Sequence, residues 1–449
     1  MNAHTDSTAS SATRAPSPDA DGARAGWWIF LAALVLRVIA VFVLHSTDKV
    51  HAGAWDFGYE AACIARSLYD GEGFAGPWTR AVAPWDLGSG ATGWLCPIYP
   101  GLVAGALHLG GGLTSTAALI LFLIQSLISS ATCVLVLRLG RALGAARAGL
   151  LAAWVLVFLP ASIWNASHTV WDTTLATFAL VSVTLAVFAW RRAGLAAFAG
   201  LGAALGLALL VNAALLALLP AWLWAVWRAR SSAGACAARL AVAAVAMLVV
   251  LMPWLWRNQQ ELGVLKLRTN LGVELAVGNN DAANGRFQVS RHPSNSAAEF
   301  LRYRALGESA YNDVCLAEGR EWIANHPERF TELCLLRATM FWFGVNPLVD
   351  ERVDDAGRTA ASDLFSWIKY MTFLAVGVLG LAGAIVWAGR AFEGRFLLGV
   401  FAVFPLVYYF VHALERYRFP IEPLLVLSAA WFALDLRARW QARSVSSSR

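Results

Sequence analysis

Two aspartates in the sequence stand where a carboxylate could take part in proton transfer. Asp56 follows the first long hydrophobic run, within Trp55–Glu60, and Asp172 begins a later hydrophobic run. A carboxylate that is partly shielded from water becomes more basic, which suits it to accept the proton of an attacking hydroxyl group. Aspartate is also common at helix N-termini, where it caps backbone N–H groups and interacts with the helix dipole. The residues alone leave both interpretations open.

Three arginines at the ends of hydrophobic runs are candidate phosphate ligands. Arg257 follows one run, and Arg416 and Arg418 precede the last one. A guanidinium group binds two phosphate oxygens at once, which makes a lipid-linked phosphate a plausible ligand. The alternative is that these side chains reach ordinary lipid headgroups. His168 is a candidate proton carrier, although a single histidine in a loop more often serves as a simple hydrogen-bonding group.

The composition predicts that membrane-spanning helices position these residues. Of the 449 residues, 58% are hydrophobic, and the mean hydropathy is +0.57. One soluble core cannot bury so much apolar surface, so we predict an all-α polytopic membrane protein. About ten runs are long enough to be spans: 27–44, 116–137, 148–164, 172–190, 194–210, 212–227, 237–255, 365–389, 396–413 and 419–436.

The segment 97–112 is a further apolar run that we do not count as a span. If it crossed the membrane, every later arginine group would lie on the outer side. The segment also contains Pro97, Pro100 and Gly110 to Gly112, which a full span accommodates poorly. We therefore predict a juxtamembrane or half-inserted helix in the first outer loop.

Groups of arginines beside the spans predict the orientation of the chain. Positively charged loops remain cytoplasmic, and the groups lie at 14 and 24, 138 to 147, 191 and 192, 228 to 239, 390 and 395, and 437 to 443. The segments 46–115, 165–171, 257–363 and 414–418 then face outside together. The segment 257–363 contains 15 of the 29 acidic residues, which predicts a water-exposed domain inserted between spans.

The predicted organisation has five parts in a bacterial inner membrane. They are a disordered cytoplasmic tail (1–26), an N-terminal transmembrane module (27–256), an extracytoplasmic domain (257–363), C-terminal transmembrane helices (364–438) and a cytoplasmic tail (439–449).

The net charge of +6 does not indicate nucleic-acid binding, because the arginines lie beside lipid. The cysteines lack metal-binding spacing, and Cys315 and Cys334 are either an external disulfide or two thiols.

The order of these features resembles the GT-C superfamily of membrane glycosyltransferases that use polyprenyl-phosphate sugars. This superfamily includes the protein O-mannosyltransferases of glycosyltransferase family 39 and the lipid A aminoarabinose transferase. The resemblance covers most of the chain after residue 27. It rests on Asp56 with Tyr59, Glu60 and Gly71 to Phe74, on Pro97 to Pro100, on Trp256 to Asn258 with Gly278 to Asn280, and on Arg416 to Pro420.

The resemblance implies an inverting sugar transfer on the outer face of the membrane. Asp56 matches the catalytic acid of the first outer loop, and Asp172 lies where many members have a second acid. Donor binding would then involve Tyr59, Glu60, Arg257, Arg416, Tyr417 and Arg418. The acceptor would be a hydroxyl group of a lipid, a polysaccharide or a protein. Many members have paired acids in this loop, whereas Phe57 follows Asp56 here, which leaves a divalent cation open.

Two other functions are compatible with a polytopic chain. A secondary transporter would have ionisable residues near the membrane midplane, often in two related halves. The predicted spans are instead mostly Ala, Leu and Val without a visible repeat, and Arg37 and Asn212 are exceptions. A non-catalytic protein that binds lipid-linked sugars would need the arginines but neither Asp56 nor Asp172.

Overall fold

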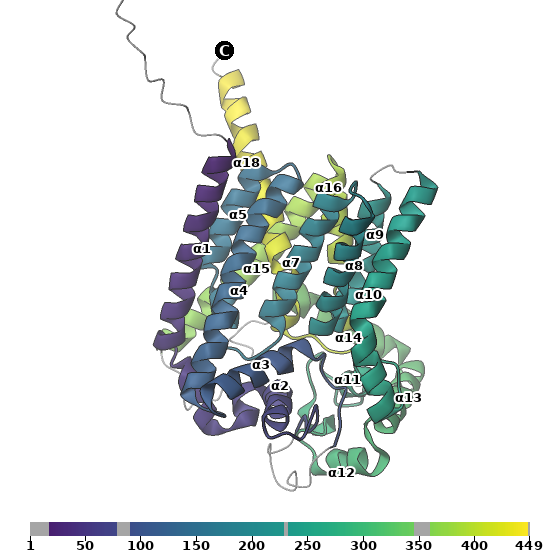
Figure 1. The fold of residues 1–449 in the computed structure, drawn as a ribbon. Coiled ribbons are helices and arrows are strands. Elements are labelled where there is room, and N and C mark those ends of the chain that lie inside the picture. The colour runs from purple at the N-terminus through teal and green to yellow at the C-terminus, as the bar shows by residue number, and fades with distance from the viewer. Residues whose placement is uncertain (1–17, 79–89, 229–231, 345–359, 448–449) are drawn as a thin grey trace, which may run out of the picture.

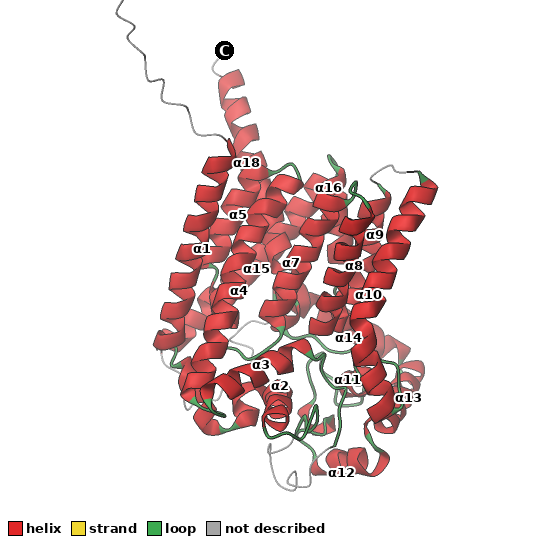
Figure 2. Ribbon diagram, in the orientation of Figure 1, coloured by secondary structure: helices red, strands yellow, loops and turns green. Residues whose placement is uncertain are grey.

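The structure is a computed structural model that describes residues 18–78, 90–228, 232–344 and 360–447. Within these ranges the regular elements are helices, with one isolated bridge between Ala75 and Ala91 (Figure 2). The predicted all-α class is therefore confirmed.

The hydrophobic runs form a bundle of roughly parallel helices (Figure 1). In chain order they are α1 (Pro18–Val43), α4 (Ser115–Ala142), α5 (Ala146–Phe158), α6 (Pro160–Ser167), α7 (Thr173–Trp190), α8 (Leu195–Val211), η3 (Ala213–Leu218) with α9 (Leu219–Trp227), α10 (Ala233–Leu262), α15 (Ala360–Ala388), α16 (Phe392–Val403), α17 (Leu406–Phe410) and α18 (Glu422–Ser447).

Fewer helices than the ten predicted are long enough to cross a bilayer. In the described part of the chain seven pass on length and apolar composition, or eight if α5 and α6, bent by 56°, form one span. α8 and the η3–α9 segment, which we predicted as spans 194–210 and 212–227, are too short. A helix of 17 residues is about 25 Å long, whereas the hydrocarbon core is about 30 Å thick. Both segments nevertheless pack against α7 in the bundle.

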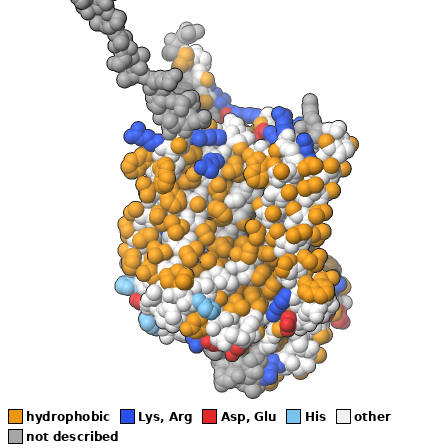
Figure 3. Space-filling view, viewed as in Figure 1, with side chains coloured by type: hydrophobic (Ala, Val, Ile, Leu, Met, Phe, Trp, Pro, Cys, Tyr) orange, Lys and Arg blue, Asp and Glu red, His pale blue; other side chains and the backbone are white. Residues whose placement is uncertain are grey.

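Charge is distributed unevenly between the two ends of the bundle. On the face shown in Figure 3, apolar side chains cover the middle, the charged side chains at one end are mainly Lys and Arg, and the other end carries Asp, Glu and His together with further Lys and Arg. The described parts of the four segments predicted to face outside lie together at the end that carries α2, α3 and α11 to α14 (Figure 1). The structure thus confirms that these distant segments share one face.

The two predicted tails are partly helical. α1 begins at Pro18 and α18 continues to Ser447. Residues 18–26 and 439–447 therefore extend the first and last helices, while 1–17 and 448–449 lie outside the described residues.

The layer at the end that carries α2 and α11 to α14 consists of short helices from two parts of the chain. The first outer loop contributes η1 (Ser46–Ala52), α2 (Ala54–Tyr69) and α3 (Ile98–Gly110). The second part contributes α11 (Leu271–Gly278), η4 (Val289–Arg291), α12 (Ala297–Leu306), α13 (Glu308–Asn325) and α14 (Pro327–Phe343). α3 has only 13 residues and packs against α2 and α4, as the prediction of a juxtamembrane helix for 97–112 requires.

These two parts share one hydrophobic core. Trp78 and Trp94 of the first loop are buried against Val277, Phe300 and Tyr303 of α11 and α12. The expected boundary at residue 257 lies inside α10, which ends at Leu262. The structure therefore shows no separate inserted domain in the described part of 257–363, because its core includes the first outer loop.

A buried carboxylate joins the same parts. Glu308 is 6% exposed and accepts hydrogen bonds from Thr92 Oγ1 (2.5 Å), the Gly93 backbone N–H (2.6 Å) and Tyr303 Oη (2.8 Å), and from Thr269. A buried carboxylate is tolerated only when its oxygens accept several hydrogen bonds. Glu308 thus fixes the first outer loop to the segment that follows α10.

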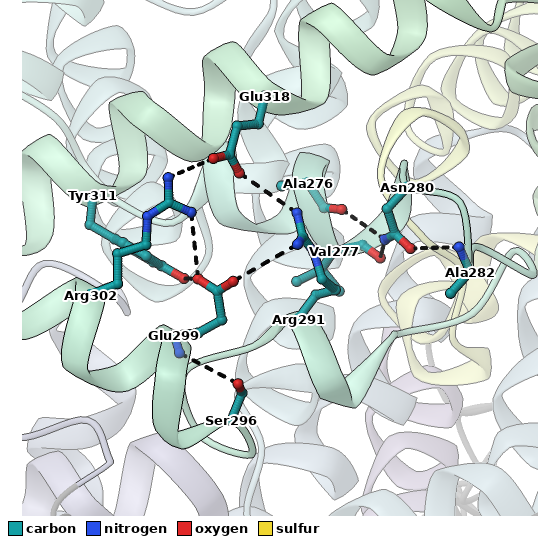
Figure 4. Close-up of polar contacts among 10 residues, drawn as sticks. All are labelled: Ala276, Val277, Asn280, Ala282, Arg291, Ser296, Glu299, Arg302, Tyr311 and Glu318. Carbon is teal, nitrogen blue, oxygen red and sulfur yellow. Dashed lines mark hydrogen bonds and ion pairs between the residues drawn. The ribbon is translucent and has the colours of Figure 1, made fainter.

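On the outer side of this layer an ion-pair network connects η4, α12 and α13 (Figure 4). Arg302 lies 2.5 Å from Glu318 and 3.8 Å from Glu299, and Arg291 lies 3.6 Å from Glu318 and 3.9 Å from Glu299. Tyr311 Oη donates to Glu299 at 2.8 Å. Several linked charges hold the short helices together more effectively than isolated surface pairs.

The bend between α5 and α6 explains why the charged residue Arg37 lies in an otherwise apolar helix. Pro160 has no N–H, so the Leu156 carbonyl group four residues earlier loses its usual helical partner. Arg37, which is completely buried, donates to this oxygen at 3.2 Å and to Ser129 and Ser162 at 2.8 and 2.7 Å. The residue is therefore structural, and it stabilises the bend that leads into the loop before Asp172.

Candidate active site

A break in helix α2 decides where Tyr59 and Glu60 lie. Tyr59 has φ 51°, a left-handed conformation that is rare for an aromatic residue. Gly58 packs on the loop between α6 and α7, because a Cβ atom at this position would lie 2.6 Å from Val170 Cγ1. The lack of a side chain at Gly58 therefore allows α2 to approach the loop that ends at Asp172.

Glu60 is directed toward positive charges, whereas Asp56 is exposed. Glu60 is half-buried, and burial raises the pKa of its carboxyl group, while the positive charges of Arg416 and Arg268 lower it. The partial desolvation that we expected for Asp56 is thus found at Glu60, because the break at Gly58 and Tyr59 turns the helix between them.

Asp172 does not cap α7 with its side chain, although it occupies the N-cap position. Its Oδ2 accepts a hydrogen bond from Asn212 Nδ2 at 2.9 Å, and Asn212 lies at the break between α8 and η3. Burial raises the pKa of Asp172, while Arg268, Arg416 and Asn212 each lower it. This contact accounts for the polar Asn212 in an otherwise apolar stretch and fixes the direction of the Asp172 carboxylate.

Arg416 and Arg268 are the two cations that act on both carboxylates. Arg416 lies in η7 (Glu415–Tyr417), with its guanidinium carbon 4.4 Å from the ring centroid of Trp171, and that ring is stacked on Tyr59 at 6.4 Å. Arg268 lies in the loop after α10, where its Nε donates to the Trp94 carbonyl oxygen at 2.9 Å. Both arginines are half-buried, so they remain partly accessible to a ligand.

The other two predicted cations have protein partners instead. Arg418 is completely buried and binds Glu422 through Nε (2.8 Å) and Nη2 (3.0 Å), with further bonds to the carbonyl oxygens of Trp342 (2.6 Å) and Phe373 (2.8 Å). Arg418, predicted to bind the donor, is therefore part of a buried ion pair.

Arg257, which was predicted to be a third phosphate ligand, donates hydrogen bonds to backbone carbonyl groups, as Arg418 does. It is half-buried and donates to Thr92 O (2.5 Å) and Phe74 O (2.6 Å) of the first outer loop. These contacts join α10 to that loop, and they use much of the guanidinium group's donor capacity.

The segment 411–418 is held in place by a buried arginine of α14. Arg337 donates to the carbonyl oxygens of Gly278 (2.5 Å) and Phe410 (3.2 Å), which lie at the C-terminal ends of α11 and α17. A cation at helix C-termini satisfies carbonyl groups that have no helical partner. Arg337 thereby positions the chain that leads to Arg416.

A third carboxylate, Glu274 of α11, belongs to the same group. Burial raises its pKa to about 7, although Arg268 and Arg416 lower it and Glu60 raises it. Its Oε2 lies 3.6 Å from Nδ1 of His412, and His412 Nε2 lies 2.8 Å from Tyr417 Oη. Tyr417, predicted as a donor-binding residue, therefore connects to Glu274 through His412.

His168, considered as a proton carrier or as a simple hydrogen-bonding group, forms a structural hydrogen bond. A ring nitrogen forms a hydrogen bond with Ser46 Oγ at 2.8 Å. Burial and the positive charge of Lys49 lower the pKa of His168 to about 4. The imidazole is thus neutral near pH 7 and joins η1 to the end of α6. Elsewhere, Cys315 and Cys334 are not joined by a disulfide.

The charge pattern suits an anionic ligand better than a divalent cation. In the described ranges no group of three or more His, Cys, Asp or Glu side chains could hold a metal ion. The positive charges of Arg268 and Arg416 act on Glu60 and Asp172 instead. These residues therefore do not fit the divalent cation left open by the sequence.

The comparisons with known proteins find similarity only in the fold. No family model and no curated protein matches the sequence. The oligosaccharyltransferase AglB from Archaeoglobus fulgidus, in complex with an inhibitory peptide and a dolichol-phosphate, superposes with a TM-score of 0.52 at 14% identity, over 94% of this chain and 52% of that one. The apo form gives 0.51 at 12% identity over the same shares.

The fold is similar to that of AglB. The chain spans about half the length of AglB, and at these identities the similarity concerns the fold alone. A further similar structure, ArnT from Cupriavidus metallidurans bound to undecaprenyl phosphate, has a TM-score of 0.37 at 15% identity over 91% of this chain and 78% of that one.

The sequence analysis did not identify Arg268, Glu274 and His412. Arg268 and Glu274 lie in a segment that we treated as a separate domain, and His412 was placed within a predicted span. The acidic and basic residues of 257–363 are so numerous that no spacing distinguishes these two. Only the packing of α11 against the segment before α18 shows which of them face the site.

Proposed function

We propose that this protein transfers a sugar from a polyprenyl-phosphate donor to the hydroxyl group of a lipid, glycan or protein acceptor. One observation supports this proposal above the others. Four distant segments bring Glu60, Asp172, Arg268 and Arg416 together where the outer layer meets the bundle. Cations that can hold a phosphate next to carboxylates that can accept a proton are what such a transfer needs.

The position of this group also suits a lipid-linked donor. Its residues come from α2, the start of α7, the loop after α10 and η7. α2 and the start of α7 lie where the bundle meets the layer of short helices (Figure 1), so the lipid tail can remain among the helices while the phosphate reaches the arginines. AglB, which has a similar fold, was solved with a dolichol-phosphate. From the distribution of arginines we propose that this face is the periplasmic or extracellular side of a bacterial inner membrane.

In the proposed reaction the acceptor oxygen attacks the anomeric carbon and inverts it. The bond between that carbon and the phosphate oxygen breaks, and the phosphate leaves with the electron pair, stabilised by Arg268 and Arg416. The acceptor proton passes to Glu60, because burial raises the pKa of this carboxyl group and a more basic carboxylate suits a general base. Asp172, held by Asn212, would orient the acceptor.

This assignment moves the base from Asp56 to Glu60. The sequence predicted Asp56 and Asp172 as the catalytic pair, with Glu60 in donor binding. Asp56 is exposed, whereas Glu60 is half-buried beside the two arginines. Because an exposed acid can still reach a bound substrate, both acids are substituted in the test below.

The test is transfer by the purified protein in a membrane extract with a panel of radiolabelled polyprenyl-phosphate sugars. Glu60→Gln should lower kcat by about 100- to 10,000-fold while the donor still binds. Asp56→Asn should have a small effect, and Glu321→Gln, an exposed residue of α13, is the matched control. If Asp56→Asn abolishes transfer and Glu60→Gln does not, the base is Asp56.

Two other outcomes would overturn the proposal itself. Donor binding without transfer to any acceptor would indicate a lipid-sugar-binding protein. Accumulation of a solute in proteoliposomes, with neither donor binding nor transfer, would indicate a transporter.

A further inference from the structure

Two buried polar atoms near the site face each other without a hydrogen bond. Glu274 Oε2 and His412 Nδ1 have no hydrogen-bond partner among the described residues, and they lie 3.6 Å apart. An unpaired buried polar atom is destabilising, so two such atoms side by side require an explanation. A movement of about half an ångström would bring them within hydrogen-bonding distance.

The other nitrogen of the same imidazole reaches the site. His412 Nε2 lies 2.8 Å from Tyr417 Oη. The guanidinium carbon of Arg416 lies 5.5 Å from the Tyr417 ring centroid, and the charges of Arg416, Glu274 and Arg268 all act on this hydroxyl group. The Tyr417 hydroxyl group thus lies among the cations that we assign to the donor phosphate.

We infer that Glu274, His412 and Tyr417 form a hydrogen-bond relay in which the protonation of Glu274 decides whether the Tyr417 hydroxyl group donates toward the phosphate. This inference rests on the proposed function. It adds Tyr417 as a hydrogen-bond donor to the phosphate, and it makes Glu274 and His412 positioning residues that act through Tyr417.

The relay has two states in which the imidazole stays neutral. When Glu274 is ionised, His412 carries its proton on Nδ1 and donates to Glu274, so Nε2 accepts the Tyr417 hydroxyl proton. When Glu274 takes up one proton from water, its O–H group donates to Nδ1, and His412 carries its proton on Nε2. Nε2–H then donates to Tyr417 Oη, which leaves the Tyr417 O–H free to donate to a phosphate oxygen.

The charges around the relay favour this titration near neutral pH. Burial lowers the pKa of His412 to about 3, with further lowering by Arg416, Arg337 and His292, so the imidazole does not become charged. Burial raises the pKa of Glu274 to about 7, and the negative charge of Glu60 also raises it, while the positive charges of Arg268 and Arg416 lower it. The carboxyl group of Glu274 therefore changes state while the other groups of the relay keep their charge.

The relay predicts a falling limb in the pH profile of kcat/KM. Tyr417 donates to the phosphate only below the pKa of Glu274, so kcat/KM should fall as pH rises through about 7. Glu274→Gln keeps a neutral side chain whose amide can donate to His412, and it should remove this limb. Tyr417→Phe should lower kcat/KM about 10- to 100-fold at pH 6 and much less at pH 9.

The control variant is Glu321→Gln, which should retain the wild-type pH profile. An infrared titration provides a second readout, which does not depend on activity. A protonated carboxyl band that disappears as pH rises through about 7 should be present in the wild type and absent in Glu274→Gln. If the wild type transfers sugar with a flat profile, or Glu274→Gln retains the falling limb, the relay is refuted. If the band titrates but no variant and no wild-type sample transfers sugar, the proposed function fails instead.

Discussion

Arg416 and Arg418 are two residues apart, and the structure places them in different environments. Arg418 is completely buried with Glu422, which is 1% exposed, and it makes two bonds to that carboxylate and two to carbonyl oxygens. Arg418→Met would leave the Glu422 charge buried and unpaired. Breaking a buried pair from one side costs about 3–5 kcal/mol, so we expect the Tm in detergent to fall by several degrees.

Arg416→Met should leave the Tm almost unchanged and weaken donor binding. Arg416 is half-buried and packs on Trp171, so its loss should change Tm little. Removing a charge-assisted contact with phosphate costs about 1.5–3 kcal/mol, which weakens donor binding about 10- to 100-fold. The double variant Arg418→Met/Glu422→Leu should recover most of the lost Tm, because no unpaired charge remains.

Thermal unfolding followed by tryptophan fluorescence, together with a donor titration, separates the two roles. Arg418→Met should unfold at lower temperature but bind the donor once folded, and Arg416→Met should fold normally and bind weakly. The opposite pattern, with Arg418→Met stable but unable to bind, would refute the assignment of Arg418 to the structure and of Arg416 to the ligand.

Three further predictions follow from the contacts around the carboxylates. Glu60→Gln should remove the rising limb of the pH profile of kcat/KM. The base works in its ionised form, so wild-type activity is lost as pH falls through the pKa of Glu60, which burial raises above the ordinary value of about 4.3. A rising limb that survives in this variant would contradict the role of Glu60 as the base. Asn212→Ala removes the hydrogen bond to Asp172, so kcat/KM should fall about 10-fold with little change in donor binding, whereas unchanged kinetics would mean that Asp172 needs no fixed direction. Gly58→Ala places a methyl group against Val170 and should lower stability by about 1–3 kcal/mol, measurable as a lower Tm, and an unchanged Tm would show that α2 can shift.

The sequence was sufficient for the membrane class and for the shared face of the outer segments. Both follow from properties that are local along the chain, namely the length of apolar runs and the position of arginines beside them. The same local reasoning placed the short helix α3 correctly, because Pro97, Pro100 and the glycines at its end are direct signals in the sequence. It overestimated the number of spans, because α8 and the η3–α9 segment are apolar like the spans but too short, with a break between them at Asn212.

The tertiary structure decided which charged residues face the site. Asp56 and Glu60 are four residues apart and look alike in the sequence, yet the backbone break at Gly58 and Tyr59 leaves one exposed and the other half-buried. Arg416 and Arg418 likewise share one motif, but only Arg418 is enclosed by α14 and α15, where it donates to the carbonyl oxygens of Trp342 and Phe373. The burial of a charge depends on segments that are distant in the sequence, so its environment is set when those segments pack together, and the local sequence does not contain it.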